Sequence, residues 1–274
     1  MYVYVNLNSF VLAFRSYDIN RDAWSWVGFN NFKQLFYDIS TLPQLRNGLK
    51  NSLLFFIISL PFTLVSLMFA YYIFKRSFVW KFFRVTLFLP SIVSGAVLYI
   101  MIRYYAELPL TMLYNAIFNQ EIVGLLSNKS TLIGTLIFFS IFLGFGTNVL
   151  IYTSCFDSVD KSVLEAARID GANELVELFV ILIPQAIGTI GVFVTVSVAG
   201  IFTNQAGLFM LYASNAPDSA YTIGYYLYRE VLRASSDAAY PKIAALGLCI
   251  TIITTPTVFG VRTLMNKLDP MLGE

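Results

Sequence analysis

The sequence predicts an all-α polytopic membrane protein with five visible transmembrane helices. Hydrophobic residues make up 57% of the 274 residues and charged residues 12%, whereas charged residues are about a quarter of a typical soluble domain. So few charges could not cover a soluble surface of this size. In addition, five stretches carry no Asp, Glu, Lys or Arg, and a helix needs about 20 apolar residues to cross a bilayer. These stretches are 51–74, 85–102, 130–156, 178–217 and 243–261.

Four of the uncharged stretches fit one crossing each. The stretch 178–217 is longer, but its apolar run ends at Asn204 and Gln205. We therefore expect one helix over about 180–203, followed by an uncharged outer segment. Prolines in such segments indicate a kink or a helix start rather than a turn. They are Pro61, Pro90 and Pro184.

The basic residues give the expected orientation in the cell membrane. Residues 75–84 hold four Lys or Arg and no acidic residue, and short basic loops stay on the cytoplasmic side. Alternation of the spans then places 157–177 and 262–274 in the cytoplasm as well. This orientation puts residues 1–50 outside.

The N-terminal segment is harder to place. It carries five basic residues, and residues 1–14 are too short and lack the basic start of a signal peptide. We therefore expect Met1 to lie inside a first transmembrane helix whose beginning is missing from this chain. Further on, Phe29, Phe32 and Phe36 recur at helical spacing, which predicts a short amphipathic helix over 28–36 at the outer surface.

We expect a single transmembrane domain over residues 1–274. Residues 1–50 would hold the remnant of the first helix and the outer amphipathic segment. The membrane core would be 51–262, with a cytoplasmic loop at 157–179, and 263–274 would be a cytoplasmic tail.

Composition excludes several chemistries. The chain has no histidine, so Ser-His-Asp catalysis and His-ligated metal sites are excluded. A net charge of +2 gives no reason to expect a nucleic-acid partner. No G-x-x-x-x-G-K-[ST] phosphate loop occurs, so the chain alone is not expected to hydrolyse ATP. Cys155 and Cys249 are expected to be small buried residues rather than a disulfide.

The sequence pattern of segment 157–184 predicts helices. Ser162 is followed three residues later by Glu165, which fits a capping box. The segment to Ile169 is a good helix former, and Gly171 suits the left-handed position that ends a helix. A second helix is expected from near Ala172, so the sequence predicts two short helices that meet at a glycine elbow.

At these positions the chain resembles the membrane subunits of binding-protein-dependent ABC importers. Their EAA motif reads EAA, three residues, G, nine residues, then I-x-L-P, and here only Ile183 replaces the usual Leu. The run Glu-Ala-Ala-Arg-Ile-Asp-Gly-Ala further resembles the maltose-permease-like branch, which imports carbohydrates. The resemblance extends over the chain from about residue 15. The motif residues are Glu165, Ala166, Ala167, Asp170, Gly171, Ile181 and Pro184.

The resemblance implies a fold, partners and a mechanism. The family core has six helices, of which five are visible here. Its EAA loop docks in a cleft of an ATPase subunit, where Glu165 would pair with a basic group, Ala166 and Ala167 would pack, and Gly171 would set the elbow. The implied partners are two ABC ATPase subunits, a solute-binding protein and a second permease, more often a different one than an identical copy. No cofactor is expected in this chain, because the partners hold ATP and Mg²⁺.

Polar groups inside apolar helices tend to face a cavity or the bundle interior. Amides and hydroxyls with an aromatic platform suit a sugar, whereas the alternative is hydrogen bonding between helices. Ser197 and Asn204 are seven residues apart and would share one helical face. The pathway candidates are Tyr99, Ser140, Phe145, Asn148, Thr195, Ser197, Thr203, Asn204 and Gln205.

Three classes of function stay open at this stage. An importer subunit for sugars fits the uncharged spans best. The same kind of subunit for a charged solute would need a fixed charge deep in a span. A membrane-embedded enzyme would need acid/base or metal ligands near the bilayer. The outer segment 213–242 could either contact a solute-binding protein or be a solvated loop.

Overall fold

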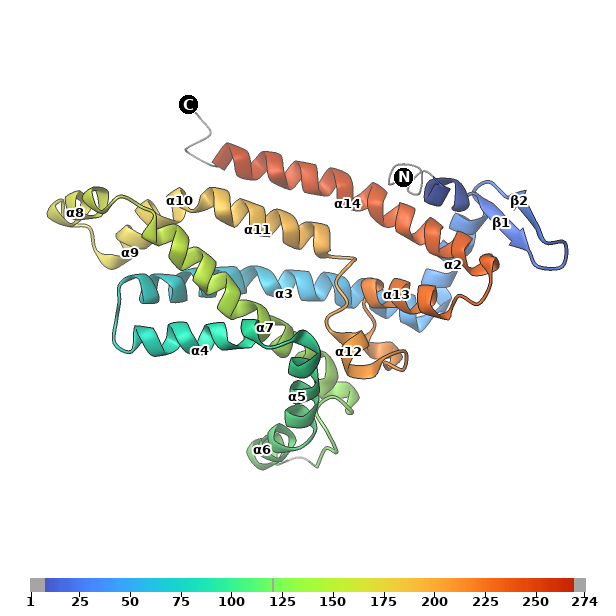
Figure 1. Ribbon diagram of the computed structural model, residues 1–274, viewed down its shortest axis with the longest axis horizontal. Coiled ribbons are helices and arrows are strands. Elements are labelled where there is room, and N and C mark those ends of the chain that lie inside the picture. The colour runs from blue at the N-terminus through green and yellow to red at the C-terminus, as the bar shows by residue number, and fades with distance from the viewer. Residues whose placement is uncertain (1–7, 120, 269–274) are drawn as a thin grey trace. The chain divides into compact units, whose positions relative to one another are not determined.

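The computed structural model describes residues 8–119 and 121–268, and most of them are helical (Figure 1). The described chain forms two compact units, one from Met1–Leu54 and Ala199–Thr257 and the other from Phe55–Val198 and Val258–Glu274. Three helices contribute residues to both units. They are α3 (Pro43–Phe74), α11 (Ile187–Gly200) and α14 (Tyr240–Leu268).

Four helical segments are long and apolar enough to cross a membrane, and a bent pair of helices adds a fifth if it forms one span. Three predicted spans are confirmed, because 51–74 lies in α3, 130–156 in α7 (Lys129–Asp157) and 243–261 in α14. Each of these helices is longer than its uncharged stretch. Of the predicted cytoplasmic tail 263–274, residues up to Leu268 continue α14 and the rest lies outside the described residues.

The predicted single helix over 85–102 is wrong. Helix α4 (Trp80–Ile92) ends at Val93, whose backbone is extended, and α5 (Gly95–Glu107) begins two residues later. Pro90 lies inside α4 and the helix continues past it to Ile92, so the break follows the proline and does not fall in the preceding turn that its ring crowds. The long apolar segment at this point is instead Gly95–Phe118, which joins α5 to α6 (Pro109–Phe118).

The predicted helix over 180–203 is also interrupted. Its first part comprises α9 (Glu174–Val176), the π-helix η1 (Glu177–Leu182) and α10 (Ile183–Gln185). Helix α11 follows at a bend of 67°. Pro184 lies directly before the bend, and it removes one backbone donor there.

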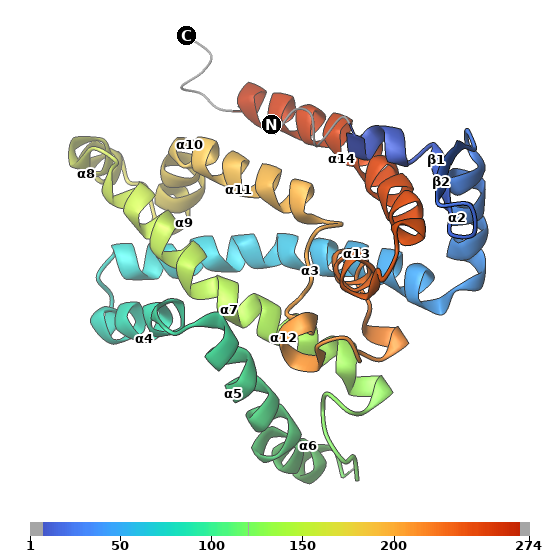
Figure 2. The ribbon, with the colours of Figure 1, turned by 45° about the vertical axis from the view of Figure 1, so that its right-hand side comes forward.

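The first unit begins with a hairpin that the hydrophobic pattern did not predict. Strands β1 (Arg15–Asp18) and β2 (Ala23–Trp26) pair antiparallel and lie beside α2 (Asn30–Thr41) (Figure 2). Asn31 fixes the contact, because its Nδ2 donates to the carbonyl oxygens of Ala13 and Arg15 at 2.8 Å each. The predicted N-terminal helix remnant falls partly outside the described residues, and residues 8–12 are helical.

The predicted amphipathic helix is confirmed as α2, which covers 30–41 instead of 28–36. Leu35 and Asp38 are buried, whereas Phe29 and Phe36 are 67% and 66% exposed. An open phenylalanine face suits a helix that lies at a membrane surface.

The segment 213–242, which is expected outside the membrane, is largely folded. It contains η2 (Asp218–Ala220), α13 (Ile223–Arg233) and η3 (Asp237–Ala239), and it follows α12 (Leu208–Tyr212). The buried Asn51 of α3 holds this segment in place, because Asn51 Nδ2 donates to the carbonyl oxygens of Ser219 and Tyr221 at 2.8 Å each. A solvated loop is therefore not an adequate description of this segment.

The second unit has its core around α7. A Cβ at Gly146 of α7 would lie 1.9 Å from the carbonyl oxygen of Leu87 in α4, so these two backbones touch. The core joins residues of α3, α7, η1 and the short helix α8 (Lys161–Ile169). Its most buried members include Leu67, Ile73, Val149, Tyr152, Phe156, Leu164, Leu178 and Leu182.

Candidate functional site

The first part of the site is α8, which Asp160 caps at its N-terminus. The Asp160 side chain accepts a hydrogen bond from the backbone N–H of Ser162 at 2.9 Å, and this bond lowers the pKa of Asp160. The predicted capping box on Ser162 is therefore wrong, because Asp160 already occupies the cap position and Ser162 lies within the first turn.

The glycine elbow at the end of α8 is confirmed. Gly171 has a φ of +85°, the left-handed region that glycine enters without strain. The N–H of Ala172 donates to the carbonyl oxygen of Ala167 and the N–H of Gly171 donates to that of Arg168, which is a Schellman ending. The next helix begins at Glu174, slightly later than expected, and Asn173 caps it.

The two halves of the EAA-like motif occupy different environments. In α8, Glu165 and Ala166 are exposed and Ala167 is half-buried, and Asp170 and Gly171 at the elbow are exposed. Past the elbow, Ile181 is half-buried and packs against the core of the second unit. The first half is therefore a free surface, and the second half attaches that surface to the membrane helices. Pro184 is half-buried beside the bend.

A buried carboxylate lies behind the elbow, and the sequence reasoning missed it. The Glu177 side chain is 3% exposed and contacts two cations. Arg168 bonds both of its oxygens, at 3.2 and 3.3 Å, and Lys75 Nζ lies 3.2 Å from Oε2. The bond to Glu177 raises the pKa of Arg168. The available signal was an acidic residue inside the apolar run 175–183.

The pathway candidates on α7 and α5 are partly buried. Ser140 and Asn148 are half-buried. The ring of Phe145 packs edge-on against Phe69 with 5.6 Å between centroids, so in this conformation it belongs to the core rather than to an open platform. Tyr99 is half-buried on α5.

The expected shared face of Ser197 and Asn204 is wrong, because α11 ends at Gly200. Asn204 instead caps a turn, since its Oδ1 accepts from the N–H of Ala206 at 2.8 Å. Its carbonyl oxygen accepts from Thr222. Ser197, Thr203 and Asn204 are exposed and Gln205 is half-buried.

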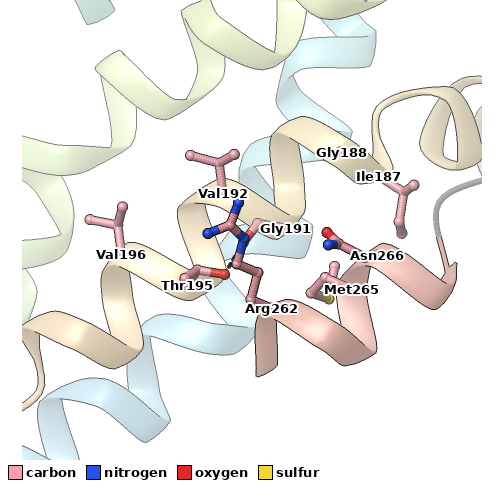
Figure 3. Close-up of a pocket in the computed structure, with 9 residues that line it drawn as sticks. All are labelled: Ile187, Gly188, Gly191, Val192, Thr195, Val196, Arg262, Met265 and Asn266. Carbon is pink, nitrogen blue, oxygen red and sulfur yellow. Dashed lines mark hydrogen bonds between the residues drawn. The ribbon is translucent and has the colours of Figure 1, made fainter. Parts of the chain in front are cut away.

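A groove of about 350 Å³ lies between α11 and α14 within the second unit (Figure 3). Thr195, one of the predicted pathway residues, lines it, although its hydroxyl donates to the carbonyl oxygen of Gly191 in its own helix. Arg262 and Asn266 of α14 supply the other polar groups. Sequence reasoning missed these two because they follow the end of the last uncharged stretch.

These features define a class of protein, a multi-pass helical membrane protein with an exposed short helix between two of its membrane segments. The profile of the family described as "Binding-protein-dependent transport system inner membrane component" matches residues 46–273. The chain belongs to this family, and it is a permease subunit, a membrane component of such a system.

Individual proteins agree with this membership. The chain is 24% identical to "Probable ABC transporter permease protein YurN" of Bacillus subtilis, over 92% of this chain and 88% of that protein. It is 27% identical to "Arabinooligosaccharides transport system permease protein AraP" of the same organism, over 92% and 79%. A solved bacterial ABC transporter involved in alginate import matches with a TM-score of 0.77 and 19% identity, over 97% of this chain and 90% of that one. That structural match supports the fold.

Proposed function

We propose that this chain is the permease subunit of an ATP-driven importer for a sugar or oligosaccharide. It would work with two ATPase subunits, a second permease and a solute-binding protein outside the membrane. Family membership and the arabinooligosaccharide permease among the similar proteins support this proposal. The three uncharged stretches that the structure confirms within α3, α7 and α14 contain no Asp, Glu, Lys or Arg, which suits a neutral solute rich in hydroxyl groups.

The observation that carries the proposal is the surface of α8. Glu165 and Ala166 are exposed on a short helix, and Leu164 on its other face is buried in the core of the second unit. A helix with this arrangement can dock in a cleft of a cytoplasmic ATPase and pass its movement to the membrane segments. Closure of the ATPase pair on ATP would then switch the pathway between its inward-facing and outward-facing states.

The solute contacts within the membrane are proposed from chemistry. Ser140 and Asn148 of α7 and Ser197 of α11 offer hydroxyl and amide groups, as Gln205 does beyond α11. Sugars are held by such hydrogen bonds, because a buried polar group needs a partner. An acidic solute is the second candidate, and the observation that favours it is Arg262 in the groove between α11 and α14.

Affinity purification from the native membrane in mild detergent tests the proposal. Recovery of an ATPase, a second permease and a solute-binding protein is expected, and that binding protein can then be titrated with neutral and acidic sugars. Recovery of this chain without an ATPase under several detergents would contradict the proposal.

The Glu165→Lys variant tests the docking surface directly. Glu165 is exposed, so the variant should insert and fold normally. It places a cation against the proposed basic cleft, and we expect loss of coupled ATP hydrolysis and of uptake. Normal uptake by this variant would count against α8 as the coupling helix.

A further inference from the structure

The strongest unassigned feature is a charge cluster in the second unit, in which the buried Glu177 contacts Arg168 and Lys75. We infer that Glu177 is a positioning residue that fixes α8 to the membrane helices, so that any movement of α8 is transmitted fully to these helices. This inference rests on the proposed function, because it concerns how the coupling helix transmits movement.

The cluster joins three separate elements. Arg168 is near the end of α8, Glu177 opens η1, and Lys75 directly follows α3. Arg168 and Glu177 are nine residues apart on opposite sides of the elbow, whereas Lys75 is 102 residues from Glu177. One carboxylate therefore connects the coupling helix to two membrane segments.

Because Glu177 is buried, its carboxylate needs these particular charged partners. The Glu177 side chain is 3% exposed, and an ionised carboxylate is costly to bury unless it is paired and hydrogen-bonded. Arg168 reaches both carboxylate oxygens through two N–H groups, a two-point geometry that restricts orientation as well as distance. Lys75, with a side chain 21% exposed, completes the charge compensation.

The apolar contact of α8 could not supply the same constraint alone. Leu164 is the buried residue of α8, and apolar packing is non-directional. Past the elbow, the chain continues as a π-helix from Glu177 to Leu182, a form that is rare and mostly found as single-turn interruptions. The ion cluster spans the junction between α8 and this segment, so it sets the direction in which α8 can move its neighbours.

The test uses the complete transporter in proteoliposomes, with ATP hydrolysis and sugar uptake measured together. Glu177→Gln keeps the size of the side chain and removes its charge. We expect ATP hydrolysis without the binding protein to stay within about two-fold of wild type. Uptake per ATP hydrolysed should fall by about five-fold or more, the low end of typical coupling between sites. Glu174→Gln is the matched control, because Glu174 is 75% exposed and 3.8 Å from Lys75, and it should behave as wild type.

Several outcomes separate the possibilities. Wild-type uptake per ATP in Glu177→Gln would overturn the inference and leave the proposed function standing. A lower yield of assembled transporter with normal uptake per ATP would show a purely structural role and would also overturn it. If wild type itself shows no ATP-driven uptake, both the proposed function and the inference fail.

Lys75→Gln keeps the inference testable if Glu177→Gln does not assemble. It removes the cation that lies outside α8 and leaves the Arg168 pair in place, so uptake per ATP should fall by a smaller factor. Full coupling in Lys75→Gln would overturn the inference in that case. In the double variant Arg168→Gln/Glu177→Gln, the loss should be no greater than in Glu177→Gln alone, because residues that act through one contact are not additive.

Discussion

The contact between α4 and α7 yields the most quantitative prediction. Gly146→Ala places a Cβ 1.9 Å from the carbonyl oxygen of Leu87, whereas real Cβ atoms do not approach heavy atoms closer than 3.0 Å. The two backbones must therefore separate by at least 1.1 Å at this point. The obstacle is a main-chain oxygen, so no side-chain rotation can relieve the contact.

The expected cost follows from two opposing effects. Overpacking in a well-packed interior costs about 1–3 kcal/mol. Replacing glycine by alanine inside a helix gains about 1 kcal/mol. Gly144→Ala on the same helix is the matched control, because a Cβ there meets nothing within 4 Å. Both variants share the helix gain, so Gly146→Ala should be about 1–3 kcal/mol less stable than Gly144→Ala.

The assay is thermal unfolding of the purified protein in detergent, followed by intrinsic fluorescence. A loss of 1 kcal/mol shifts Tm by about 2–4 °C in chains of about 150–250 residues. We expect an apparent Tm several degrees lower for Gly146→Ala than for Gly144→Ala. Equal values for the two variants would refute the close approach of α4 and α7.

Two further predictions concern hydrogen bonds. Asn51→Ala removes a buried hydrogen bond to the carbonyl oxygen of Tyr221 and a part-buried one to that of Ser219. One buried unsatisfied group costs about 1–3 kcal/mol, so the apparent Tm should fall. Asp160→Ala removes the cap of α8, so the α8 amides should exchange hydrogen faster. Because the folded pKa of Asp160 is lowered, its stabilisation is present above the unfolded pKa and is lost as pH falls through the folded pKa.

Matched variants control both predictions. Asn47→Ala removes one exposed hydrogen bond, to Asp218, and should change Tm little; an equal fall would contradict the role assigned to Asn51. Asp160→Asn keeps a capping oxygen that does not titrate. It should protect α8 at neutral pH and show no loss across the acid range. Faster exchange in Asp160→Asn as large as in Asp160→Ala would argue against the cap.

The sequence predicted those parts of the fold that depend on composition and local conformation. Long uncharged stretches located α3, α7 and α14, because burying a charge in a bilayer is costly. Gly171 predicted the elbow because a left-handed ending favours glycine at that position. The helix-forming residues that precede Gly171 predicted the helix that the structure shows as α8, and the EAA resemblance implied its coupling role.

The remaining features depend on contacts between distant residues. Uncharged stretches say nothing about where a helix breaks. Pro90 and Pro184 indicated a kink or a helix start, but they did not predict the interruptions that follow Ile92 and Gln185. The phenylalanine spacing located α2, but it did not predict that Leu35 and Asp38 are buried, because that burial depends on the neighbours of the helix. Glu177 acquires its importance from Lys75, 102 residues away, and no local pattern could reveal that pairing.

The most direct test of the central claim is photo-crosslinking from α8 in the native membrane. Ile169 at the end of α8 is 87% exposed, and a photoreactive residue there should give an adduct with an ATP-hydrolysing subunit, identified by mass spectrometry. Tyr37 on α2 is 63% exposed and lies in the segment expected outside the membrane, so it should give no such adduct. An ATPase adduct from both positions, or none from Ile169, would contradict the account.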